Sequence, residues 1–140
     1  MKRAYLGLLI IAMVSQFAFA AESSGVKVDV LAKSTLSWDG NVLPNYPVGK
    51  PEITILKIAI APKTTLPLHQ HPLINAGVLL KGVLTVITED KKVLYLKAGE
   101  ALIEVVDKWH YGVNEGEETA EIVVFYAGVQ GQALSQTKAP

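Results

Sequence analysis

Three histidines are the residues of this sequence whose type and spacing point most directly to chemistry. His69 and His71 are two residues apart, so in a β-strand both imidazoles project from the same face. His110 lies in another predicted strand, which an adjacent barrel wall can bring alongside them. Neutral imidazoles bind divalent metals well, and three of them leave positions open for water or substrate. The three side chains therefore predict a metal site, although a surface histidine pair in a strand is a common alternative.

The residues around these histidines form a pattern in two parts. The first part contains His69, His71, Asn75 and Gly82, and the second contains Gly99, His110 and Asn114. The pattern resembles the two motifs of the cupin superfamily, which hold two His, a Glu and a Gly, followed by a Gly, a Pro, a third His and an Asn. The resemblance covers most of residues 53–126. It implies an all-β fold, a small β-barrel of conical jelly-roll type with the metal inside, and frequently a homodimer.

The sequence departs from the cupin pattern at the metal ligands. Asn75 stands where the family usually has its glutamate, so the resemblance implies a ligand set of His69, His71 and His110 with Asn75 as, at most, a neutral fourth ligand. An uncharged set leaves the full +2 on the ion, which favours direct binding of an anionic substrate. The same departure also fits a site that has drifted away from catalysis. Elsewhere Lys63 and Asp107 replace family glycines, and Val105 replaces the proline.

Two further polar residues near the motifs have structural alternatives. Glu104 can replace the missing carboxylate, but its spacing to Lys108 favours a solvated surface ion pair. Asn114 is expected to fix the turn that follows His110 through hydrogen bonds to the backbone.

Short segments rich in β-formers must position these side chains. Turn residues separate them at intervals of about 8 to 12 residues, and no long helical period intervenes, which is typical of an all-β sandwich or barrel. The predicted strands are Val26–Val30, Ile53–Ile60, Leu66–His71, Ala76–Leu80, Leu84–Thr88, Val93–Leu96, Ala101–Val105, Trp109–Val113 and Glu121–Tyr126. The stretches 21–25 and 132–140 lack hydrophobic periodicity and are expected to fray. We therefore expect one cupin-like barrel domain over residues 26–131.

The first 20 residues have the pattern of a signal peptide. Lys2 and Arg3 form a positive n-region, residues 4–14 are an uninterrupted apolar run, and Ala18 and Ala20 supply the small residues before a cleavage site. The mature protein is expected to begin at Ala21 and to be periplasmic or secreted, without a membrane anchor. The sequence has no cysteine, which excludes disulfides and cysteine-based metal sites.

The charge balance bears on the partners. The chain has 13 basic and 13 acidic residues, and Arg3 is its one arginine. Without the basic patch that phosphate backbones require, nucleic acid is not an expected partner. A small-molecule ligand or substrate is expected instead.

Two functions stay open from the sequence. The first is a small-molecule metalloenzyme, such as a dioxygenase, an isomerase or a lyase. The second is a non-catalytic module that binds or senses a small ligand or the metal itself. The ligand set suits Fe, Mn, Ni, Cu or Zn, so the sequence does not select the metal.

Overall fold

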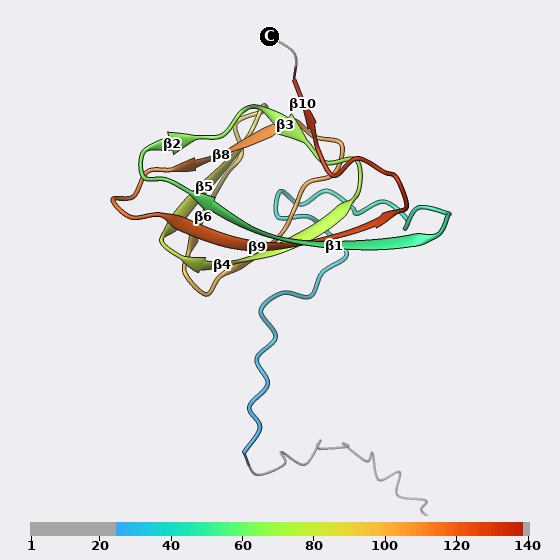
Figure 1. The fold of residues 1–140 in the computed structure, drawn as a ribbon, viewed down its shortest axis with the longest axis horizontal. Helices are drawn as coiled ribbons and strands as arrows, with labels where there is room; N and C mark the ends of the chain where they lie inside the picture. Colours follow the sequence, from blue (N-terminus) through green and yellow to red (C-terminus); the bar gives the residue numbers. More distant parts are fainter. Residues whose placement is uncertain (1–24, 139–140) are drawn as a thin grey trace, which may run out of the picture.

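The structure, a computed structural model, describes residues 25–138. Within this range the chain forms ten β-strands and no helix, as the all-β expectation requires (Figure 1). The strands are β1 (Pro51–Ile60), β2 (Thr64–Thr65), β3 (His69–Gln70), β4 (Ile74–Lys81), β5 (Val83–Thr88), β6 (Val93–Lys97), β7 (Ala101–Ile103), β8 (His110–Asn114), β9 (Ala120–Val129) and β10 (Gln136–Thr137). Among the described residues there is accordingly no helix able to cross a membrane. The predicted signal peptide lies outside them.

The strands form two antiparallel sheets that face each other. One sheet has the order β1-β9-β4-β7, and the other has the order β10-β3-β8-β5-β6, with β2 pairing to β8. Figure 1 shows β1, β9 and β4 in one layer and β3, β8, β5 and β6 in the other. Neighbours in space are often distant in sequence, as for β1 and β9, which pair along ten residues each. This is the jelly-roll barrel expected from the motifs.

Period-two alternation decides which side chains enter the barrel. Along β4, buried residues alternate with half-buried ones, so that Asn75, Gly77 and Leu79 point inward. Ile122 and Val124 of β9 do the same, and they belong to the buried hydrophobic core. Because successive side chains in a strand point to opposite faces, one register fixes the whole inner surface. The inner surface therefore combines an apolar core with a few polar residues.

Backbone conformations at the turns explain several motif positions. Gly82 has a φ of +75°, and a Cβ at this position would lie 3.0 Å from the Cα of Ala120. Lys63 and Asp107, which replace family glycines, adopt φ angles of 56° and 52°. This left-handed region favours glycine. Both substituted positions thus adopt a backbone conformation that a glycine would favour.

Two predictions about the ends of the chain were wrong. The segment Val26–Val30 is not a strand, although its valines alternate with polar residues; it is exposed and leads away from the sheets in Figure 1. Alternation alone does not make a strand, because the backbone also needs a pairing partner. At the other end, the stretch from Gln132 does not simply fray, since β10 pairs with β3.

The predicted strand Leu66–His71 is divided in the structure. β2 ends at Thr65, β3 begins at His69, and Pro67 lies between them, where its ring removes a backbone donor. His71 follows β3 and lies outside it. The predicted single strand is therefore wrong at this end, although the rings of His69 and His71 do lie together, with their centroids 5.0 Å apart.

Candidate metal centre

The pairing of β3 with β8 brings the two parts of the histidine pattern together. His69 lies directly opposite His110 in the antiparallel register, and their ring centroids are 4.5 Å apart. Opposed residues in an antiparallel pair project from the same face. His110 is 2% exposed and begins β8, whose inward residues include Gly112 and Asn114. The pairing of β3 with β8 thus brings together two histidines that are separated by 40 residues in the sequence.

The third imidazole is fixed by the C-terminal segment. The Nδ1 atom of His71 lies 2.8 Å from the carbonyl oxygen of Leu134. Its ring centroid is 5.0 Å from that of His69 and 5.1 Å from that of His110. On its other side the ring contacts Tyr126 of β9 edge-on, at 5.6 Å. The segment after Gln132, expected from sequence to fray, is therefore part of the site.

All three imidazoles have the same tautomer, set by backbone carbonyls. Each Nδ1 donates a hydrogen bond of 2.8 Å, to Pro67, Leu134 or Lys108. Since a carbonyl oxygen accepts only, the proton of each neutral ring is on Nδ1, and each Nε2 carries a free lone pair. One ligand atom from each ring lies within 4.8 Å of the others. Outer hydrogen bonds of this kind orient metal-binding histidines, so the donor set fits a divalent ion.

Burial keeps two of these imidazoles neutral. It lowers the pKa of His71 from its ordinary value of 6.5 to about 4, and it lowers the pKa of His110 to about 4 as well. Burial disfavours the charged imidazolium because the interior solvates it poorly. Both rings are therefore unprotonated near neutral pH, as metal binding requires.

The metal-free protein should lose stability as pH falls below about 6.5. The folded-state pKa values of His71 and His110 lie below the value expected in the unfolded chain, so the unfolded state binds more protons in this window. The stabilising contribution is complete above about 6.5 and decreases down to the folded-state pKa near 4. Urea unfolding of the metal-free protein at pH 7 and pH 5.5 measures this contribution. Equal free energies of unfolding at the two pH values would contradict the prediction.

Glu104 is a site residue that the sequence analysis placed wrongly. It does not form a solvated pair with Lys108, because its side chain is buried, at 7% exposed, and Lys108 binds Asp39 and Asp90 instead. The Oε2 atom of Glu104 lies 3.8 Å from Nε2 of His110. Burial raises the pKa of this carboxyl above its ordinary value of 4.5. The sequence did contain a signal for this burial: Glu104 is two residues after Leu102, so a continued period-two alternation points both side chains inward.

Asn75 also points into the barrel, where the family resemblance put a fourth ligand. The residue is 2% exposed, and its Nδ2 donates a long hydrogen bond of 3.4 Å to the carbonyl of Leu73. Its strand partner across β9 is Tyr126, which contacts His71. Ligation of the metal by Asn75 stays a prediction.

The interior next to the histidines contains a small cavity of about 70 Å³. Its walls are mainly aliphatic, and its polar lining comes from His69, Glu104 and His110. Few polar groups in an apolar cavity are typical of small-molecule sites. The cavity is, however, several times smaller than the roughly 300–1,000 Å³ of sites for drug-sized ligands, so it suits a molecule of only a few heavy atoms.

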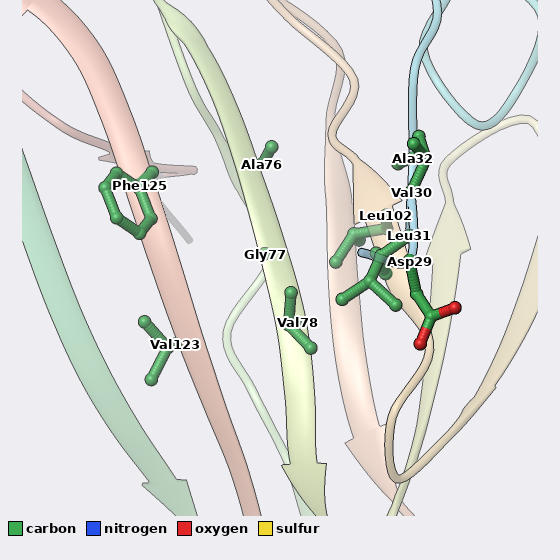
Figure 2. A pocket seen from close by; sticks show the side chains of 11 residues that line it. Asp29, Val30, Leu31, Ala32, Ala76, Gly77, Val78, Leu102, Val123 and Phe125 are labelled. Carbon is green, nitrogen blue, oxygen red and sulfur yellow. The ribbon is translucent and has the colours of Figure 1, made fainter. Parts of the chain in front are cut away.

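A larger hollow of about 410 Å³ lies outside the barrel. Figure 2 shows it between residues 29–32 and the outer faces of β4, β7 and β9. Its lining is almost wholly apolar, with Asp29 as the charged side chain and with no histidine. Because metal ligands are the strongest chemical signal in this chain, we place the candidate site inside the barrel and not in this hollow.

The fold and the site together define a small antiparallel β-barrel with three convergent histidines inside it. The family model for the cupin domain matches residues 56–126, which is half of the chain. The chain therefore belongs to the cupin family.

Solved structures show the same fold at low sequence identity. An oxalate oxidase in complex with the substrate analogue glycolate matches with a TM-score of 0.52 and 26% identity, over 61% of this chain and 45% of that one. The oxalate decarboxylase of Lactobacillus farciminis matches with a TM-score of 0.53 and 18% identity, over 61% of this chain and 26% of that one. An uncharacterised protein with a double-stranded β-helix domain from Klebsiella pneumoniae matches with a TM-score of 0.52 and 20% identity, over 66% of this chain and 90% of that one. This chain thus spans less than half of the oxalate enzymes' length. No curated protein matches it.

Proposed function

We propose that this cupin is an exported metalloenzyme that binds one divalent metal ion through His69, His71 and His110 and acts on a small anionic molecule. The observation that carries the proposal is the common tautomer of the three rings, whose free Nε2 atoms converge beside an apolar cavity. A purely structural barrel has no need for three oriented lone pairs around one point.

A bound metal would supply Lewis acidity and a direct attachment point for an anion. The protein supplies position and exclusion of water: the aliphatic cavity walls, including Leu84 and Ile122, surround the ligands. Lysines of the described chain do not line this cavity, so an anionic group has no ammonium partner there. The ion would therefore be the main determinant of anion binding.

The cavity size and one relative suggest the substrate class. A volume of about 70 Å³ favours a molecule of a few heavy atoms. The similarity to an oxalate oxidase, at 26% identity, supports a small carboxylate as the first candidate. The whole activity of that longer enzyme is not implied by a match over 45% of its length.

The decisive experiment is metal analysis of protein purified from its native compartment, followed by activity assays of the same sample. We expect about one divalent ion per chain. Oxygen consumption and product release should then be measured with oxalate and other small carboxylates, and with diketones, phenols and thiols. Turnover that disappears on chelation and returns with metal supports the enzyme. Protein isolated without any bound divalent metal, and unable to take one up, would contradict the proposal.

A non-catalytic binding or sensing module is the alternative function. It predicts stoichiometric metal and a measurable affinity for a small ligand without turnover of any compound in the panel. The departure at Asn75 from the family's glutamate favours this alternative. Calorimetric titration of the same small carboxylates into the metal-loaded protein separates the two.

Export is a further part of the proposal, and it predicts a defined mature N-terminus. The pattern of Lys2, Arg3, the apolar run and Ala18–Ala20 should direct cleavage after Ala20. Intact-mass measurement of periplasmic or secreted protein should give a chain that begins at Ala21. A product that keeps residues 1–20 in the membrane fraction would contradict this prediction.

The homodimer also stays a prediction. The outer face of the β1-β9-β4-β7 sheet carries large apolar side chains that are about half exposed or more, namely Ile53, Ile55 and Phe125. Exposed apolar patches are typical of interaction surfaces. Sedimentation of the mature protein tests the prediction, and a monomer mass across a wide concentration range would contradict it.

A further inference from the structure

A buried carboxylate lies beside the three histidines. Glu104 follows β7 and is 7% exposed, and its Oε2 atom is 3.8 Å from Nε2 of His110. Two ligand atoms that each lie about 2.1 Å from one ion can be at most about 4.2 Å apart. The separation of Oε2 and the Nε2 atom of His110 therefore allows these two atoms to bind the same ion. The group of ligand atoms that lie within 4.8 Å of one another comprises the three histidines, so Glu104 would approach the ion from the side of His110.

The two oxygens of this carboxylate have different surroundings. Oε1 accepts hydrogen bonds from Nε1 of Trp38, at 2.8 Å, and from the backbone N–H of Val105, at 2.9 Å. Among the described residues, no donor binds Oε2, which is the oxygen nearest His110. One oxygen is thus anchored by two N–H groups, while the other lies near the His110 imidazole without a hydrogen-bond donor of its own. This is the arrangement expected of a carboxylate that binds a metal through one oxygen.

The sheet register relates Glu104 to the position of the missing family ligand. Ala76 of β4 pairs with Ile103 of β7, and the next residues continue the ladder through a 3.0 Å hydrogen bond from the Glu104 N–H to the carbonyl of Asn75. Opposed residues of an antiparallel pair project from the same face, with Cβ atoms about 5 Å apart. Asn75 and Glu104 are both buried, which is consistent with this shared inward face. The carboxylate therefore lies one strand away from the position where the cupin pattern has its glutamate.

Electrostatics favours a cation at this point. An ionised carboxylate withdrawn from water is expensive unless a charge or hydrogen bonds compensate it. The imidazole 3.8 Å from Oε2 is that of His110, whose pKa burial lowers, and Lys108 is engaged with Asp39 and Asp90. A divalent ion would compensate the charge directly.

We infer that Glu104 is the charged fourth ligand of the metal centre, binding through Oε2, and that Trp38 is the residue that positions it. The inference rests on the proposed metal-binding function and deepens it. A carboxylate ligand adds a hard oxygen donor to the three imidazoles, which raises the relative affinity for Mn(II) and Fe(II) over a purely nitrogen-donating set. The Glu104 carboxylate then cancels one of the two positive charges of the ion, although position 75 has no glutamate.

The variant Glu104→Gln tests the ligand. Its amide oxygen can still accept from Trp38 and Val105, but its NH₂ group cannot bind a cation. We expect the affinity for Mn(II), measured by chelator competition and by the EPR signal of free Mn(II), to fall at least about 100-fold, since even outer partners of ligands contribute 10- to 100-fold. Glu100→Gln is the matched control, because that exposed carboxylate binds the backbone N–H of Lys97, and its affinity should match wild type.

Moving the carboxylate back provides a gain-of-function test. In the double variant Glu104→Gln with Asn75→Glu, the new side chain projects from the opposed position of the neighbouring strand. We expect the Mn(II) affinity to return to within about 10-fold of wild type. A double variant that binds Mn(II) no better than Glu104→Gln alone would overturn the inference.

Trp38→Phe tests positioning. This change removes the N–H donor and keeps a ring against the core, so Mn(II) affinity should fall about 10-fold in the wild-type background and should not fall further in the Glu104→Gln background. If the losses of Mn(II) affinity from Trp38→Phe and Glu104→Gln add up in the double variant, Trp38 does not act through Glu104.

The outcomes distinguish the inference from the proposed function. Wild-type protein that binds no divalent metal would overturn the function. Wild-type protein that binds Mn(II), together with a Glu104→Gln variant that binds it equally well, would overturn only the assignment of Glu104. If the metal-free variant has the same unfolding temperature as metal-free wild type, a folding defect does not account for lost affinity.

Discussion

Replacing His110 by Ala should abolish stoichiometric metal binding and remove the rise in melting temperature that metal produces. His110 is the best-buried of the three imidazoles, and it lies opposite His69 across the β3–β8 pair. Loss of one of three nitrogen ligands should lower the affinity by well over the roughly 100-fold seen for losses around a ligand. At a metal concentration 1,000 times the wild-type Kd, binding stabilises the folded state by about 4 kcal/mol. In a domain of this size that corresponds to roughly 15 °C.

The measurement compares melting curves with and without metal for each variant. The metal-induced shift is the informative quantity, because truncating a buried ring also lowers the stability of the metal-free protein. Tyr111→Phe, a change to the next residue of β8, whose side chain is half-buried on the opposite face, is the matched control and should keep the full shift. Equal metal content and an equal shift in wild type and His110→Ala would contradict the three-histidine site.

Replacing Asn114 by Ala should give a large loss of stability without involving a metal ligand. The side chain is fully buried, and its Nδ2 group donates to the carbonyls of Ile60, Ala61 and Glu118, at 2.8 to 3.1 Å. Its Oδ1 accepts from the N–H of Gly116 at 3.0 Å. The expected role in fixing the turn is thus confirmed, and it extends to the end of β1. Removal leaves the buried carbonyl of Ile60 and three partly buried backbone groups without this partner, and each group that stays out of water costs about 1–3 kcal/mol.

We expect the free energy of unfolding to fall by about 3–4 kcal/mol in Asn114→Ala, because some of the exposed carbonyls will find water. Chemical denaturation of the metal-free protein measures the loss. Asn114→Asp is the informative companion: it keeps the shape and the acceptor for Gly116 but replaces the amide donors by a carboxylate that faces carbonyls, so it should be at least as destabilised. A loss below about 1 kcal/mol in both variants would show that these hydrogen bonds contribute little.

The sequence determined the fold class and the three histidines that the structure brings together as a candidate metal site. Short alternating segments separated by turn residues predict antiparallel strands because each strand carries its own period-two signal. The types and spacing of His69, His71 and His110 were sufficient to predict a metal site because imidazole chemistry is local to the residue. The cupin motifs added the barrel, since they place these residues at defined distances from turn glycines such as Gly82.

Tertiary structure decided how these three side chains are held and what lies beside them. The tautomer of His71 depends on a carbonyl 63 residues away, at Leu134, in a segment without a strong strand pattern. Glu104 is buried and accepts a hydrogen bond from Trp38, 66 positions earlier, whereas its spacing to Lys108 suggested an exposed ion pair. The valines at 26, 28 and 30 carry a strand pattern but find no partner strand among the described residues. Each of these features depends on which distant segments meet, and local periodicity contains no information about that pairing.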